Sequence, residues 1–209
     1  MRAGGFWDAI AAMGGRHLTP GQAVVALDEA SQIIRQAWDV STRGGVRVNG
    51  TLVPSQRGRT GAGTAPAHDI PIWVGAYKPK MLELTGCTAD GWLPSLGYLP
   101  GGPADLAEAN KRIDDAALAA GREPGHIRRL INIGGQFSTI SRGSFSGPPE
   151  QWAEELAELT LDHGITGFIL AADDADSIEL FATEVAPATR QLVAEERRLR
   201  GTRRSDQVE

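Results

Sequence analysis

The stretch IPIWVGAYKPKMLELTGCTADGWLPS, residues 70–95, decides the fold of this chain. Its first apolar run stops at Gly75 and Ala76, which is typical of the end of a buried strand. A helix is predicted to open at Pro79, because proline is favoured at the first helical position. A second apolar run starts after Asp90. This order of strand, helix and strand predicts a parallel pair joined by a crossover helix.

The same alternation continues along the rest of the chain. Strands are predicted over 70–76, 91–95, 129–135 and 165–172, and helices over 79–89, 103–120, 148–162 and 176–199, the last interrupted before Pro187. Strands separated by helices form an α/β fold with a parallel sheet, either an open doubly wound sheet or a β/α barrel. In both architectures ligands gather at the carboxyl ends of the strands.

The remaining segments are also assigned from local patterns. Residues 19–22, Thr-Pro-Gly-Gln, predict a capping box at the start of a helix. The segment VRVNGTLV, residues 46–53, alternates around an Asn-Gly pair and predicts a β-hairpin. The glycine-rich stretch that follows, 54–69, is predicted to be a loop that is mobile or closes over a ligand. One domain is predicted over 1–199, with a charged, disordered tail over 200–209.

The composition excludes several classes of function. With 41% hydrophobic and 22% charged residues, the 209-residue chain is typical of a soluble globular protein. A net charge of -5 argues against nucleic-acid binding, and no apolar run approaches the length of a membrane span. The single cysteine, Cys87, cannot form an internal disulfide, which favours a cytoplasmic location. The four histidines are scattered, so no metal site is predicted.

Positive charge at the start of the helix at Pro79 runs against the usual preference. A helix N-terminus already carries a partial positive charge, which favours anions and disfavours lysine. Lys78 and Lys80 therefore indicate a negatively charged ligand, and the small Gly75 and Ala76 would let it approach the backbone. Together these features favour a phosphate cradle. The alternative is that both lysines reach solvent and the small residues only let helix and strand pack.

Three segments carry a resemblance to a known family: GGFWDAIAAMGG (4–15), TPGQAVVALDEASQIIRQAW (19–38) and IPIWVGAYKPKMLELTGCTADGW (70–92). They follow one another as in luciferase-like flavin-dependent oxidoreductases, and the chain resembles this family from about Gly4 to about Val193. The most specific pieces are the WVGA strand end and the ADGW strand start. The resemblance implies an eight-stranded β/α (TIM-type) barrel with an inserted hairpin. It also implies FMN or the deazaflavin coenzyme F-420, used for hydride transfer or O2-dependent monooxygenation of a small-molecule substrate.

The resemblance assigns one group of cofactor-binding residues to the first strand end. Gly75 and Ala76 match the position where the family's backbone approaches the cofactor near its phosphate, and Tyr77 and Lys78 continue that loop. Family members often have a small residue where Lys78 stands, so the tightness of the cradle is open. Asp90 is equally characteristic of the family, but it is interpreted as a structural residue that caps and turns the chain into the next strand.

A second group of cofactor-binding residues lies near the amino terminus. Gly4, Gly5, Trp7 and Asp8 match another cofactor-facing strand end, where the glycines would admit the ring system. The alternative for Trp7 is packing against Ile10 within a helix. No general base, nucleophile or triad is identified, so the catalytic residues are unknown.

The resemblance also implies that the barrel is partial. Four full strands follow the amino terminus, and the family's amino-terminal half, which carries its ring-facing histidine and acidic residues, is not in this sequence. We therefore expect self-association or a partner that supplies the missing barrel half. The alternative is a non-catalytic truncated remnant that binds a phosphate-bearing ligand or a partner barrel half. A doubly wound nucleotide binder is a third reading, but the chain lacks its glycine fingerprint.

Overall fold

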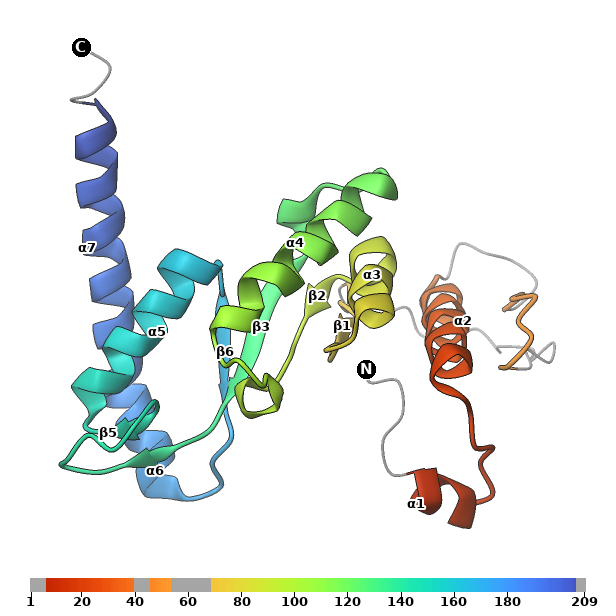
Figure 1. Ribbon diagram of the computed structural model, residues 1–209, viewed down its shortest axis with the longest axis horizontal. Coiled ribbons are helices and arrows are strands. Elements are labelled where there is room, and N and C mark those ends of the chain that lie inside the picture. Colours follow the sequence, from red (N-terminus) through yellow and green to blue (C-terminus); the bar gives the residue numbers. More distant parts are fainter. Residues whose placement is uncertain (1–6, 40–45, 54–68, 206–209) are drawn as a thin grey trace. The chain divides into compact units, whose positions relative to one another are not determined.

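The structure is a computed structural model that describes residues 7–39, 46–53 and 69–205. The chain divides into two compact units, one made of residues 1–93 and 109–128 and the other of residues 94–108 and 129–209. Figure 1 labels the helices and most of the strands of both units. Each unit contains its own parallel pair of strands.

The first unit begins with two helices, α1 (Trp7–Ala12) and the longer α2 (Pro20–Trp38). The predicted capping box at the start of α2 is confirmed. The Gln22 backbone N–H donates to Thr19 Oγ1 at 3.3 Å, and the Thr19 N–H donates to Gln22 Oε1 at 2.9 Å. These reciprocal bonds satisfy donors that the start of a helix otherwise leaves free. On its inner face α2 buries Leu27.

Residues 70–95 form the predicted strand, helix and strand. β1 (Trp73–Val74) and β2 (Gly91–Trp92) pair in parallel, and α3 (Pro79–Thr88) connects them. The part of α4 (Ala104–Ala119) that belongs to this unit packs closely on α3 at Gly86. A Cβ atom at Gly86 would meet the Ala116 side chain at 2.8 Å, so the close approach of the two helices requires glycine there.

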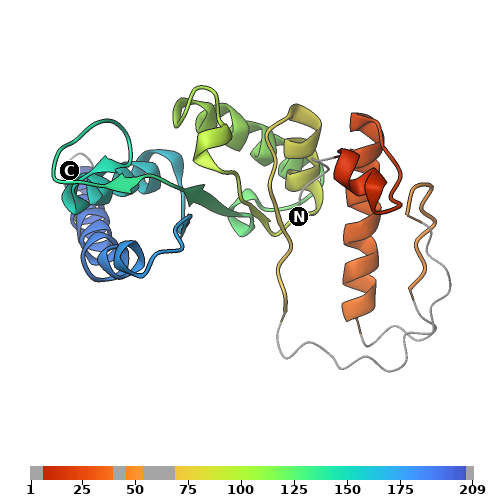
Figure 2. The same ribbon diagram turned by 90° about the horizontal axis from the view of Figure 1, so that it is seen from below.

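The predicted hairpin is corrected by the structure, because described residues 46–53 form no strand. The segment runs along α2 instead, as Figure 2 shows. Glu29 of α2 is only 6% exposed and accepts hydrogen bonds from the N–H groups of Thr51 at 2.7 Å, Leu52 at 3.0 Å and Val53 at 2.7 Å. The bond from Val53 is the main cause that lowers the pKa of Glu29. The carboxylate of Glu29 thus accepts hydrogen bonds from backbone N–H groups that, in a hairpin, would donate to a partner strand.

The second unit is built on β3 (Arg128–Ile133) and β6 (Gly167–Leu170), which pair in parallel. In the chain, β3 and β6 are separated by a small parallel pair of strands and a helix. These are β4 (Gln136–Phe137), β5 (Ser146–Gly147) and α5 (Pro149–His163). Trp152 of α5 is 1% exposed, and its ring lies 4.4 Å from the ring of Phe137, measured between centroids. This stacking fixes the β4–β5 pair against α5. The 3-10 turn η1 (Leu96–Tyr98) lies in this unit, whereas η2 (Pro124–His126) lies in the first unit.

The last helical region is interrupted before Pro187, as predicted. α6 (Ala175–Leu180) continues into the π-helical turn η3 (Phe181–Val185) and then into α7 (Ala186–Ser205), which lies beside α5 in Figure 1. Proline lacks the N–H of a regular helix, which accounts for a wider turn just before it. The predicted disordered tail is corrected in part, because α7 remains helical through Ser205. Residues 206–209 lie outside the described part, and the domain boundary at residue 199 stays a prediction.

The predicted α/β class is confirmed. All four expected strands form, both long-range pairs are parallel, and helices separate them along the chain. No closed barrel forms among the described residues, which agrees with a partial barrel.

Candidate functional site

Four of the predicted cofactor-binding residues lie at the end of β1. Gly75 and Ala76 follow Val74 directly, and Tyr77 and Lys78 lead into α3. Exposure rises from Ala76 onward: Ala76 is 1% exposed, Tyr77 is half-buried and Lys78 is exposed. The segment therefore reaches the surface at the carboxyl end of a parallel strand, where α/β folds bind their ligands.

Trp92 of β2 holds this strand end, a role that sequence reasoning missed. Its side chain is fully buried, and the indole Nε1–H donates a hydrogen bond to the Ala76 carbonyl at 2.9 Å. The next residue, Leu93, donates its N–H to the Val74 carbonyl at 2.9 Å. The signal in the sequence is the succession of WVGA and ADGW, but residue order alone does not reveal the indole hydrogen bond between them.

The start of α3 carries positive charge and no acidic group. Lys78 occupies the N-cap position, no side chain caps the helix, and its first turn contains no Asp or Glu. The backbone N–H groups of Met81 and Leu82 donate to the Lys78 carbonyl at 2.9 and 3.0 Å. Lys78 and Lys80 are both exposed. The positive end of the helix and two lysine residues thus lie within one turn, an arrangement that favours an anion.

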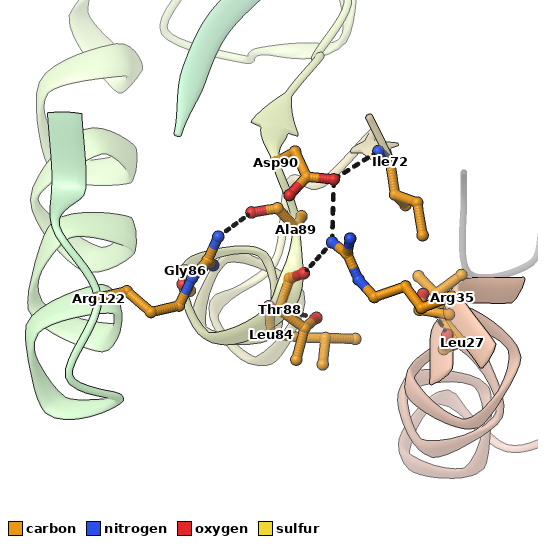
Figure 3. Close-up of polar contacts among 10 residues, drawn as sticks. Leu27, Arg35, Ile72, Leu84, Gly86, Thr88, Ala89, Asp90 and Arg122 are labelled. Atoms are coloured by element: carbon orange, nitrogen blue, oxygen red, sulfur yellow. Dashed lines mark hydrogen bonds and ion pairs between the residues drawn. The ribbon is translucent and has the colours of Figure 1, made fainter. Parts of the chain in front are cut away.

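The C-terminal end of α3 has the charge that helix electrostatics prefers. Arg122 donates to the carbonyls of Gly86 at 2.6 Å and Ala89 at 2.7 Å (Figure 3). A cation here satisfies the last carbonyls and the partial negative charge of the helix. The lysines at the other end of α3 are therefore the exception that calls for a ligand.

Asp90 lies before β2 and connects three elements (Figure 3). Its Oδ2 accepts hydrogen bonds from the Ile72 N–H at 2.8 Å and from the guanidinium of Arg35 at 2.9 Å. Arg35, on α2, also donates to the Thr88 carbonyl at 2.8 Å, in the last turn of α3. These contacts support the interpretation of Asp90 as a structural residue, because its carboxylate ties the backbone before β1 to α2. The predicted cap into the next strand stays a prediction.

The other predicted site residues lie near the amino terminus. Gly4 and Gly5 fall outside the described residues. Trp7 and Asp8 open α1, where Asp8 is exposed in the first turn. The structure therefore brings Gly75–Lys78 together as one segment, and the contribution of the amino-terminal group stays a prediction.

The sequence analysis did not identify a polar pair in the second unit, Asn132 and Ser95. Asn132 interrupts the apolar run of β3, and its Nδ2–H donates to Ser95 Oγ at 3.1 Å. A polar residue inside an otherwise apolar parallel strand is the signal that could have marked it.

The described residues contain neither a cluster suited to a metal ion nor a membrane-spanning helix. No group of three or more His, Cys, Asp and Glu side chains among them could hold a metal ion. None of the helices in 7–39 and 69–205 is both long and apolar enough to cross a membrane.

Residues 2–142 match the family model for the luciferase-like monooxygenases. The chain belongs to this family. The matched range contains both predicted groups of cofactor-binding residues as well as Trp92. The resemblance stated from the sequence is thus confirmed.

Curated relatives of this luciferase-like chain include reductases. The phthiodiolone/phenolphthiodiolone dimycocerosates ketoreductase of Mycobacterium tuberculosis is 42% identical over 193 aligned residues, covering 79% of this chain and 46% of that protein. The 5,10-methylenetetrahydromethanopterin reductase of Methanolobus tindarius is 43% identical over 61 residues, covering 29% of this chain and 18% of that protein. The chain therefore spans less than half the length of these relatives.

Solved structures share the fold of this chain. An F-420-dependent secondary alcohol dehydrogenase, in complex with an F-420–acetone adduct, has a TM-score of 0.73 at 16% identity, covering 90% of this chain and 68% of that chain. The coenzyme F-420-dependent tetrahydromethanopterin reductase from Methanopyrus kandleri has a TM-score of 0.65 at 21% identity, covering 90% and 72%. At these identities the likeness shows the fold alone. It confirms the predicted β/α architecture of the luciferase-like kind.

Proposed function

We propose that this chain belongs to an oxidoreductase that binds the phosphate of a deazaflavin or flavin at the Gly75–Lys78 strand end. The observation that carries the proposal is the start of α3, an uncapped helix N-terminus with lysines on both sides of Pro79. Only Tyr77 separates it from two small residues, Gly75 and Ala76, at the end of β1. An anion there would be stabilised by the helix dipole and by both ammonium groups.

Hydride transfer with coenzyme F-420 is the reaction we favour over oxygen insertion with FMN. The relatives named above are a ketoreductase and a methylenetetrahydromethanopterin reductase, and both solved structures are named as F-420-dependent. The proposed substrate is a small organic molecule whose carbonyl or alcohol group exchanges a hydride. FMN-dependent monooxygenation is the alternative within the family.

The residues of this chain would bind and orient the cofactor. A bound deazaflavin supplies the hydride chemistry itself, and the protein positions it and tunes its surroundings. Lys78 and Lys80 would hold the phosphate by charge, while Gly75 leaves room for its approach to the backbone. The amino-terminal residues Trp7 and Asp8, with Gly4 and Gly5, are proposed to face the ring system.

The groups that face the substrate are proposed to come from barrel strands beyond those described, supplied by a partner barrel half or by self-association. This chain matches 46% of the length of the ketoreductase. Its described residues present four of the strands that an eight-stranded barrel requires. No catalytic residue is assigned to this chain. A cytoplasmic location is part of the same proposal, since Cys87 is a free, exposed thiol.

Substitution of Gly75 by valine tests the location of the phosphate. We expect Gly75→Val to weaken binding of F-420 and FMN at least about tenfold, or about 1.4 kcal/mol, because its branched side chain would block approach to the backbone. Gly21→Val in α2 is the control, since a Cβ there meets nothing within 4 Å. Calorimetric and absorbance titrations give both affinities. If the unmodified chain binds neither cofactor, the proposed function fails. If Gly75→Val binds as tightly as wild type, the assigned location fails.

A further inference from the structure

The buried indole of Trp92 is not among the groups proposed to touch the cofactor. It reaches from β2 to the Ala76 carbonyl at 2.9 Å, and the two residues are 0% and 1% exposed. At this depth bulk water does not replace the indole as a donor. A buried carbonyl that loses its hydrogen bond is destabilised, so the observed conformation of the strand end depends on this contact.

The hydrogen bond sets the direction of one peptide plane. A peptide unit is planar and trans, so its C=O and N–H groups point in opposite directions. Because the Ala76 carbonyl turns toward Trp92, the N–H of Tyr77 in the same peptide turns to the other side. Leu93 holds the Val74 carbonyl two residues earlier. Rotation of the backbone between Val74 and Tyr77 is therefore restricted from both ends.

We propose that Trp92 is a positioning residue for cofactor binding. Its indole N–H holds the Ala76–Tyr77 peptide in the orientation that lets a phosphate approach the start of α3. The inference rests on the proposed function and adds a residue that acts through Ala76 and does not touch the cofactor. The role depends on the indole N–H of Trp92 as a hydrogen-bond donor and not on the volume of its ring.

A second buried tryptophan separates the effect of the donor from that of the ring. Trp152 is 1% exposed, and its Nε1 has no hydrogen-bond partner among the described residues. Its ring packs against Phe137 and Phe145, with centroid distances of 4.4 and 5.1 Å. Trp152→Phe removes the same atoms as Trp92→Phe from an equally buried position, but breaks no hydrogen bond. It is the matched control.

The experiment compares the full wild-type chain with these two variants. The measurements are the affinities for F-420 and FMN, the melting temperature, and amide hydrogen exchange over residues 76–80. We expect Trp92→Phe to weaken cofactor binding about tenfold, which is about 1.4 kcal/mol, and to speed exchange at Tyr77 and Lys78. Trp152→Phe should leave affinity and local exchange close to wild type, even where its melting temperature falls.

Each outcome decides the role of Trp92. If Trp92→Phe binds the cofactors as tightly as wild type, the positioning role is overturned. Equal losses of affinity in both variants also overturn it, because the lost ring volume would then explain the effect. If the wild-type chain binds neither cofactor, the proposed function fails, and local exchange judges the positioning role separately. Faster exchange at Tyr77 in Trp92→Phe alone then shows that the indole holds the Ala76–Tyr77 peptide, whereas unchanged exchange overturns that hold.

Discussion

At the scale of single residues, Asp90 serves the fold. Its carboxylate accepts hydrogen bonds from the Ile72 N–H and from Arg35. Asp90→Ala removes both, so we expect the free energy of unfolding to fall by about 1 to 2 kcal/mol. Cofactor affinity should stay close to wild type. Asp115→Ala is the control, because its ion pair with Lys111 is exposed and contributes little. Urea unfolding and calorimetric titration measure both effects, and lost affinity at unchanged stability would contradict this assignment.

The sequence reveals some of these residues better than others. Gly75 and Lys78 stand out because small residues at a strand end and a lysine at a helix start are visible in residue order. The role of Trp92 is not visible, because its indole reaches Ala76 only once the two strands adopt their register. That register places Val74 opposite Trp92, and it arises from packing between segments that are distant in sequence.

At the scale of elements, Glu29 joins α2 to residues 51–53. The backbone bond from Val53 chiefly, and those from Thr51 and Leu52, lower the pKa of Glu29 below its ordinary value of 4.5. A lowered folded-state pKa means that this stabilisation is present above the unfolded-state pKa. It is lost as the pH falls through the lower folded-state pKa.

Glu29→Gln tests this link between α2 and the segment. We expect the variant to have a lower melting temperature at neutral pH, because an uncharged amide accepts the backbone hydrogen bonds less strongly. Its melting temperature should also change less than that of wild type between neutral and acidic pH. Glu154→Gln on the exposed face of α5 is the control. Parallel pH curves for wild type and Glu29→Gln would show that Glu29 does not hold the segment.

Regular elements could be predicted from periodicity, and the segment beside α2 could not. Apolar spacing locates α3, α4 and α5 because one helical face is buried along their length. The hairpin prediction over 46–53 relied on the Asn49-Gly50 pair. In the structure, a Cβ atom at Gly50 would lie 2.6 Å from Glu29 Oε2. The glycine is therefore required by the approach of a carboxylate, a tertiary contact that local sequence does not encode.

At the scale of the whole molecule, β6 is paired along one edge only within the described second unit. The Ala171 N–H donates to the Ile133 carbonyl at 2.8 Å. Backbone donors alternate between the two edges of a parallel strand, so the Ile169 N–H faces β3 and those of Phe168 and Leu170 face away from it. The Ile169 side chain is also 40% exposed. An edge of this kind favours pairing with a further strand.

We therefore expect the purified 209-residue chain to self-associate. Ile169→Lys should reduce association by placing a charge on the open edge. Ile178→Lys on α6 is the control, because that side chain is 48% exposed and lies outside the strand. Light scattering measures the mass of each protein. A monodisperse wild-type monomer would contradict the expectation, and so would equal association of both variants.

The central claim is that a cofactor phosphate binds where β1 passes into α3, and an amide NMR titration of the full chain tests it most directly. F-420, FMN and inorganic phosphate are added in turn, and the shift of every backbone N–H is followed. We predict that both cofactors shift the amides of Tyr77, Lys78 and Lys80 most, and that phosphate shifts the same amides more weakly. No shift with either cofactor, or shifts confined to other parts of the chain, would contradict the claim.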